Sequence, residues 1–104
     1  EEANGVFAFF SSQMGSLQNT RSSDAALYRI SKAALNMVVR TAQHDYPRAR
    51  MVAVHPGWVQ TDMGGMQATL TPTQSVTQLR QTLAAVTDAH KGQFLSYDGT
   101  PLPW

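Results

Sequence analysis

Residues 27–36 read LYRISKAALN, and the rest of the chain is organised around this stretch. Its pattern is that of the beginning of a helix, in which Tyr28 and Lys32 are four residues apart and share one face. A unit positive charge at about 4 Å stabilises a phenolate by roughly 4 kcal/mol when the effective dielectric constant is about 20. The pair is therefore a candidate for general acid–base chemistry. Tyr and Lys at this spacing are also common as ordinary surface side chains, so their neighbours must decide between the two interpretations.

The helix is predicted to run from Ala25 to about Asp45, with Ser22 or Ser23 as its N-cap and Pro47 ending it. Asp24 is favourable in the first turn. A narrow polar stripe, expected to face outward, comprises Arg29, Asn36, Arg40 and Gln43. A second, mostly apolar face comprises Ile30, Ala34, Met37, Val38 and Thr41. We expect such a helix to be covered on more than one side, by its own sheet and by a second subunit in a homodimer.

Three short apolar runs are predicted to be strands. Residues 6–10 (VFAFF) lack polar alternation, which is typical of a strand buried on both faces in a parallel sheet. Residues 50–55 form a second buried strand and residues 93–97 a third. Because a helix lies between the first two strands, they are expected to be parallel in a βαβ crossover. The loops that follow Phe10 and His55 therefore lie at the same edge of the sheet.

The second half of the chain contains one more predicted helix. Thr71-Pro72 is a cap followed by proline at the first helical position. Lys91-Gly92 is expected to close this helix. Its apolar side comprises Val76, Leu79, Leu83 and Val86. After the third strand, Asp98-Gly99 predicts a turn, and the two prolines that follow argue against a returning ladder strand.

Composition excludes several classes of function. The chain has 104 residues, enough for one domain with a modest core, and a net charge of +1 without a run of basic residues. Nucleic acid and anionic membranes therefore have no electrostatic attraction to it. No apolar run is long enough to span a bilayer, no signal peptide is recognised, and no cysteine is present. A cytoplasmic location is the expectation from these features.

Other chemical sites find little support. His44, His55 and His90 lack metal-ligand spacing, so no metal site is predicted. Ser12 does not lie in a G-x-S-x-G elbow, which argues against a serine hydrolase. It does follow the first strand, at the edge where parallel sheets bind ligands. Trp58 is expected in the core rather than at a substrate, whereas lining a pocket, packing on the sheet and contacting a subunit all stay open for Trp104.

Three motifs in order are similar to one family. They are SQMG at 12–15, YRISKAALN at 28–36 and HPGWVQTDM at 55–63. Together they resemble the short-chain dehydrogenase/reductase family, and the ending at 92–104 resembles the branch with C-factor-like proteins and carbonyl reductases. The resemblance implies a partial doubly wound parallel-sheet α/β fold of Rossmann type. It also implies that residues 1–104 are a single C-terminal, catalytic fragment that lacks the N-terminal nucleotide-binding strands.

The resemblance assigns roles to particular residues. Tyr28 would exchange a proton with a carbonyl or alcohol oxygen, and Lys32 would favour the ionised phenol and bind the nicotinamide ribose. Ser12 would hydrogen-bond the substrate oxygen. Tyr28 and the Pro56-Gly57 bend would also contact the nicotinamide cofactor, and the bend would lead to the residues that hold its carboxamide. Those residues are Val59 and Thr61, and the cofactor would be NAD or NADP.

The chain also departs from the family pattern. The glycine-rich loop that takes the pyrophosphate is absent, as are the residue that selects NAD or NADP and the family's catalytic Asn. Asn36 is not expected to replace that Asn, because it falls on the outward stripe. An NAD(P)-dependent oxidoreductase, inactive as this chain alone, is the favoured function. The alternative is a non-catalytic relative that acts in binding, signalling or dimerisation.

Overall fold

Three parallel strands form the centre of the computed structural model, which describes residues 5–58 and 70–104. The strands are β1 (Val6–Phe10), β2 (Arg50–His55) and β3 (Gln93–Ser96), in the order β1-β2-β3. Val6 is opposite Arg50, and Val52 is opposite Gln93. The predicted βαβ crossover is confirmed, and the third strand ends one residue earlier than expected.

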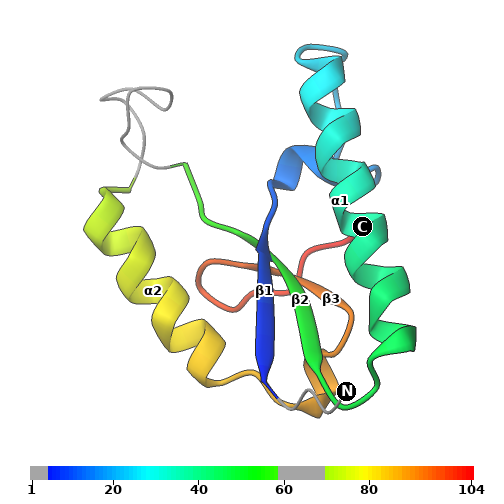
Figure 1. Ribbon diagram of the computed structural model, residues 1–104. Coiled ribbons are helices and arrows are strands. Elements are labelled where there is room, and N and C mark those ends of the chain that lie inside the picture. Colours follow the sequence, from blue (N-terminus) through cyan, green and yellow to red (C-terminus); the bar gives the residue numbers. More distant parts are fainter. Residues whose placement is uncertain (1–4, 59–69) are drawn as a thin grey trace.

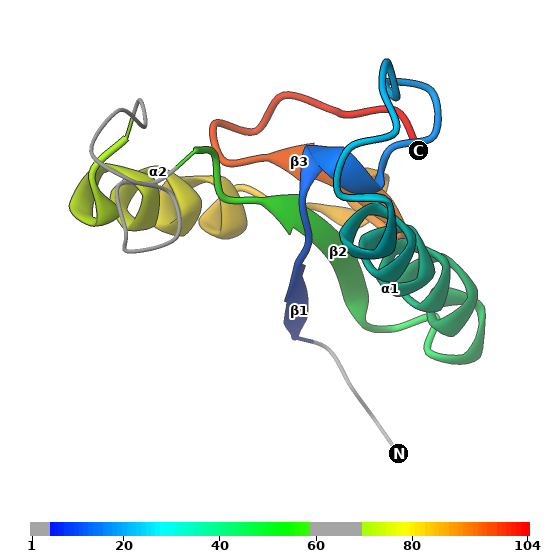
Figure 2. The same ribbon diagram turned by 90° about the horizontal axis from the view of Figure 1, so that it is seen from above.

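Two helices cover the two faces of this sheet. α1 (Ala26–Asp45) lies on one side and α2 (Pro72–Ala84) on the other, which makes a three-layer α/β arrangement (Figure 2). Two 3₁₀ turns, η1 (Gln13–Gly15) and η2 (Asp88–His90), follow β1 and precede β3. Within the described ranges, neither helix is long and apolar enough to cross a membrane.

The alternation of β2 side chains builds two separate cores. Met51 and Ala53 belong to a cluster beneath α1, together with Val39 and Phe94. The intervening valines of β2 belong to a second cluster on the α2 side, whose buried members are Val52, Val54, Leu79, Val86 and Leu95. Since successive side chains of a strand point to opposite faces, a strand buried on both faces serves both cores.

The orientation of α1 is the reverse of the one that its sequence suggested. Its polar stripe faces the sheet and the neighbouring loops: Asn36 is buried, and Arg40 donates a hydrogen bond to the Gly92 carbonyl at 3.1 Å. Gln43 donates to the Ala49 carbonyl and accepts from the Met51 N–H, at 2.9 Å each. The apolar face is open instead, and both Ile30 and Met37 are 63% exposed. The assignment of Asn36 to an exterior stripe was therefore wrong.

The beginning of α1 also differs from the prediction. The N-cap position is Ala25, whose φ is +55° and whose side chain makes no capping bond. The residues expected to cap serve another purpose, because Ser22 donates to the Asp24 carboxylate, which also pairs with Arg29 at 3.0 Å. The Ser22 hydroxyl, and after it the Arg29 guanidinium, lower the pKa of Asp24 below its usual range.

Two predictions of burial need correction. β1 is an edge strand among the described residues, so Val6, Phe7 and Phe10 are exposed rather than buried on both faces. Trp58 is exposed as well.

α2 differs from its prediction in the exposure of one side chain and at its C-terminal end. Val76 is exposed, and the helix ends at Ala84 rather than continuing to Lys91. It ends there because Thr87 caps a new 3₁₀ turn, accepting from the Ala89 N–H at 3.3 Å. At its beginning the predicted cap is confirmed. Thr71 and Gln74 form a reciprocal capping box at 3.1 and 2.9 Å.

The alternatives for Trp104 are resolved by its contacts. Its ring stacks on Phe94 with centroids 5.3 Å apart, and it lies 5.8 Å from the Arg40 guanidinium carbon. It also borders a cavity of about 230 Å³ beside α1. The residue thus packs on the core and lines a pocket. The turn predicted at Asp98-Gly99 is present, and only an isolated bridge joins Leu95 to Pro101.

Candidate active site

Those predicted site residues that the structure describes lie at the carboxyl edge of the sheet. β1 leads directly into Ser12 and η1, while β2 leads into Pro56 and Gly57. Figure 1 shows η1 and the first half of α1 beyond the carboxyl ends of these two strands. A hydrogen bond between the loops, from the Gln13 N–H to His55 Nδ1 at 3.2 Å, confirms that they share one edge.

Ser12 is held in a well-defined turn. It is 8% exposed, and its Oγ accepts a hydrogen bond from the Met14 N–H at 3.1 Å, so it caps η1. The residue before it continues the ladder, since the Ser11 N–H donates to the Val54 carbonyl at 2.7 Å. A serine hydroxyl has one hydrogen to donate and two lone pairs. The contact with Met14 uses a lone pair, which leaves the hydroxyl hydrogen for another acceptor.

Tyr28 and Lys32 lie together as their spacing predicts. The Lys32 Nζ atom is 5.6 Å from the centre of the Tyr28 ring, a cation–π distance. The same ammonium donates to the Phe10 carbonyl at 3.3 Å, which places it at the end of β1. Tyr28 remains 43% exposed. The phenol is therefore accessible beside a fixed positive charge.

Close packing joins the Ser12 turn to Lys32. A Cβ atom on Gly15 would lie 2.9 Å from both the carbonyl carbon and the Cβ of Lys32. Real Cβ atoms essentially never approach that closely, so only glycine allows η1 to rest on α1 here. The sequence-predicted Ser12, Tyr28 and Lys32 are thus linked through η1, although their catalytic roles stay predictions.

The bend after β2 is equally specific. Gly57 has a φ of +86°, which side chains rarely adopt, and a Cβ there would lie 2.3 Å from Leu70 Cδ1. The Pro56 carbonyl accepts from the Ser75 hydroxyl at 2.7 Å, so α2 fixes the bend. Val59 and Thr61, predicted to contact the cofactor, lie outside the described residues.

The reasoning from sequence missed the contacts of three residues at this edge, which are Ser11, Asn36 and His55. His55 belongs to the HPGWVQTDM motif without an assigned role, yet it accepts a hydrogen bond from η1, and burial lowers the pKa of its imidazole. Asn36 accepts from the Ser11 hydroxyl at 2.7 Å. A signal for Asn36 was present, because positions 28, 32 and 36 share one helical face. If Tyr28 and Lys32 face the site, Asn36 cannot face away from the protein.

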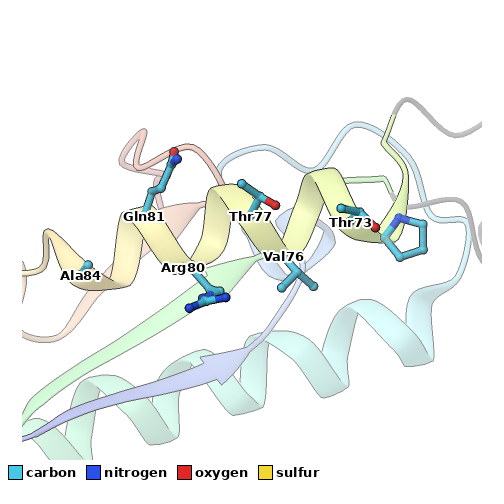
Figure 3. A pocket seen from close by; sticks show the side chains of 7 residues that line it. Thr73, Val76, Thr77, Arg80, Gln81 and Ala84 are labelled. Carbon is cyan, nitrogen blue, oxygen red and sulfur yellow. The ribbon is translucent and has the colours of Figure 1, made fainter.

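An open depression runs along α2, away from these residues. It has a volume of about 710 Å³ and lies along a helix surface from which Val76 and Arg80 project (Figure 3). Its lining residues are Pro72, Thr73, Val76, Thr77, Arg80, Gln81 and Ala84. None of the predicted catalytic residues borders it. Among the residues that the structure describes, no group of three potential His or acidic metal ligands occurs.

Comparisons with known proteins agree with this geometry. No family model matches the chain. It is 46% identical over 99 residues to C-signal of Myxococcus xanthus, a match that covers 93% of this chain and 60% of that protein. The structure of the carbonyl reductase Sniffer of D. melanogaster superposes with a TM-score of 0.91 and 42% identity, over 95% of this chain and 41% of that one.

A second solved structure extends the pattern. The NADPH-bound carbonyl reductase from chicken fatty liver has a TM-score of 0.87 and 36% identity, over 95% of this chain and 42% of that one. The parallel sheet and the crossover helix define a partial Rossmann-like α/β fold. The relatives and structural neighbours of the chain are of the short-chain dehydrogenase/reductase type, and the chain spans about 40 to 60% of the length of the three proteins described above.

Proposed function

We propose that this chain supplies the catalytic residues of an NAD(P)-dependent oxidoreductase that interconverts a carbonyl compound and an alcohol. The observation that carries the proposal is the Lys32 ammonium 5.6 Å from the half-exposed Tyr28 ring, at the edge where the buried Ser12 follows β1. The carbonyl reductases that share its fold support the same class of reaction.

Each of the three residues has a separate role in this proposal. Tyr28 donates its phenolic proton to the carbonyl oxygen during reduction and accepts a proton during alcohol oxidation. Lys32 stabilises the phenolate that is left, since its charge is held in place by the Phe10 carbonyl. Ser12 donates its free hydroxyl hydrogen to the substrate oxygen, where negative charge develops.

The donor set fits one end of a nicotinamide cofactor, either NAD or NADP. An ammonium carries three N–H donors, and Lys32 uses one of them for the Phe10 carbonyl. The remaining donors can bind a ribose diol next to the accessible Tyr28 side chain. The Pro56-Gly57 bend would adjoin the nicotinamide. When bound, the reduced nicotinamide supplies the hydride. No glycine-rich phosphate loop occurs in this sequence, so the proposal covers only the nicotinamide end.

Replacing one phenol by a phenyl ring tests the proposal. Tyr28→Phe in the protein that carries this chain should lower the rate of carbonyl reduction by about 10²- to 10⁴-fold, the usual contribution of a general acid. Cofactor affinity should change little. Tyr46→Phe is the matched control, because Tyr46 is 47% exposed at the other end of the same helix. Equal turnover in the two variants would remove Tyr28 from its role.

A non-catalytic function is the second candidate, and two observations favour keeping it. The relative with 46% identity is named C-signal, and the apolar face of α1 is open. We propose that this face binds a second copy of the chain in a homodimer, which either function could use. A signalling relative would keep dimerisation in Tyr28→Phe and show no hydride transfer in the unmodified protein.

A further inference from the structure

We infer that Ser11 and Asn36 form a positioning pair, which fixes the turn that carries Ser12 against the helix that carries Tyr28 and Lys32. The catalytic consequence of this inference rests on the proposed function. The positioning itself is a statement about the fold and is tested separately below.

A single buried hydrogen bond makes the connection. The Ser11 Oγ donates to Asn36 Oδ1 at 2.7 Å, and the two residues are only 4% and 3% exposed. Ser11 directly precedes Ser12, and Asn36 lies about one helical turn after Lys32. The bond therefore ties the residue beside the candidate substrate donor to the helix turn beside the candidate ammonium.

A second contact with α1 lies on the other side of Ser12. Gly15 rests against the backbone of Lys32, with room for no side chain. Between Ser11 and Gly15 the chain makes a single 3₁₀ turn, in which the Gly15 N–H donates to the Ser12 carbonyl at 2.9 Å. Ser12 is thus bracketed by two fixed points on one helix, and the Ser11–Asn36 bond provides the polar one.

Stability alone does not account for an asparagine at this place. The Asn36 amide nitrogen is buried and has no hydrogen-bond partner among the described residues. A buried polar group without a partner costs about 1–3 kcal/mol, and two apolar side chains of the same shape would avoid that cost. A buried polar bond instead defines one geometry, because it has a preferred length and direction.

Variants of the pair test the inference in the protein that carries this chain. Ser11→Ala and Asn36→Leu should each lower kcat for carbonyl reduction roughly 10- to 100-fold, as expected for a displaced reacting group, with little change in KM. The double variant should be about as slow as the slower single variant, because both changes break the same bond. If Asn36→Leu does not fold, Ser11→Ala decides alone.

Thr82→Val is the matched control. Thr82 is similarly buried, and its hydroxyl donates to the Tyr97 carbonyl at 2.7 Å on the opposite face of the sheet. It should lose comparable stability and keep its kcat well below the melting temperature. A kcat for Ser11→Ala within about twofold of the parent value, or an equal loss in Thr82→Val, would overturn the inference.

Amide hydrogen exchange provides a readout that does not depend on activity. In Ser11→Ala the amides of Gly15 and Ser16 should exchange at least about tenfold faster, because η1 loses one of its anchors, while Thr82→Val should leave them unchanged. Unchanged exchange in Ser11→Ala would refute the positioning. If the parent protein shows no hydride transfer, the proposed function fails, and the exchange result still decides whether the pair positions the turn.

Discussion

At the scale of single residues, the turn that carries Ser12 depends on a missing side chain at Gly15. Its contact with the Lys32 backbone leaves no room for a methyl group. We expect Gly15→Ala to lower the free energy of unfolding by about 1–3 kcal/mol, the usual cost of overpacking. Chemical denaturation measures this change. Gly5→Ala is the control, because a Cβ at Gly5 would meet nothing closer than 4.0 Å and should be nearly neutral.

His55 should make stability depend on pH. Burial lowers the pKa of its imidazole below the unfolded value of about 6.5, and Nδ1 accepts the Gln13 N–H only when that nitrogen carries no proton. The contribution of neutral His55 to the free energy of unfolding is therefore fully present when the pH is above the unfolded pKa. It is lost as the pH falls through 6.5 towards the lower folded pKa, because the unfolded state then binds more protons.

Denaturation between about pH 5 and 7 measures this effect, with a slope of at most about 1.4 kcal/mol per pH unit. His55→Asn is the control, since an amide oxygen can accept from Gln13 without titrating. A slope that persists in His55→Asn would show that other groups cause it. Asp24 and Asp88, whose pKa values lie below the usual range, act only at more acidic pH.

Reasoning from sequence located Tyr28 and Lys32 together because their relation is local. Four residues along a helix bring two side chains to one face whatever the rest of the protein does. The bond between Ser11 and Asn36 joins residues 25 positions apart, so it depends on how the helix is rotated over the sheet. The spacing between Tyr28 and Asn36 indicates which face of the helix is directed toward the sheet, but the polar character of Asn36 suggested the opposite face.

At the scale of elements, α1 shows why the polarity of its residues alone predicted the wrong orientation of the helix. Beside the apolar Val39, it carries polar side chains that bind backbone carbonyls of neighbouring segments, as Arg40 and Gln43 do. Such groups can face a protein interior when each finds a partner. A hydrophobic pattern indicates which faces will be covered, but it does not distinguish the face toward the sheet from a face toward another chain.

The N-terminus of α2 makes a quantitative prediction, because its capping box was evident from Thr71-Pro72 and is present. Thr71→Ala should lower the free energy of unfolding by about 1 kcal/mol, since the Gln74 N–H loses its acceptor. Thr73→Ala is the control, being exposed in the same first turn and outside the box. Equal losses in the two variants would mean that general helix propensity, rather than capping, is measured.

At the scale of the whole molecule, the exposed apolar face of α1 should drive association. Its exposed members are Ile30, Ala34, Met37, Val38 and Thr41, and the exposed Leu27 lies one turn before them. Sedimentation of the 104-residue chain should show a larger species whose population grows with concentration. Val38→Lys should shift the equilibrium towards the monomer, because it places a charge in the contact.

Gln78→Lys adds the same charge on α2 and should leave the association unchanged. If neither substitution changes the self-association, a surface other than the apolar face of α1 is responsible for it. The exposed β1 edge is the principal competitor, because its open backbone groups can pair with another strand. A monomer at all concentrations would refute the proposed homodimer.

The pairing of the strands could be predicted from sequence, but which apolar side chains are covered by other residues could not. The parallel pairing of β1 and β2 follows from one crossover helix between two apolar runs, which local patterns reveal. Burial was expected because of apolar character, yet four of these side chains are exposed among the described residues, namely Val6, Phe7, Phe10 and Val76. Burial is a property of the whole assembly in which an element sits, so composition reports only that some covering is favourable.

The alternation along β2 has a consequence for insertions and deletions. Met51 and Ala53 serve the core under α1, while Val52 and Val54 serve the core under α2. Adding or removing one amino acid within this strand would turn the side chains that follow to the opposite face of the sheet. Both hydrophobic cores would be disrupted at once. Changes of chain length can therefore be accommodated in the connections of this protein, whereas its middle strand must keep its length.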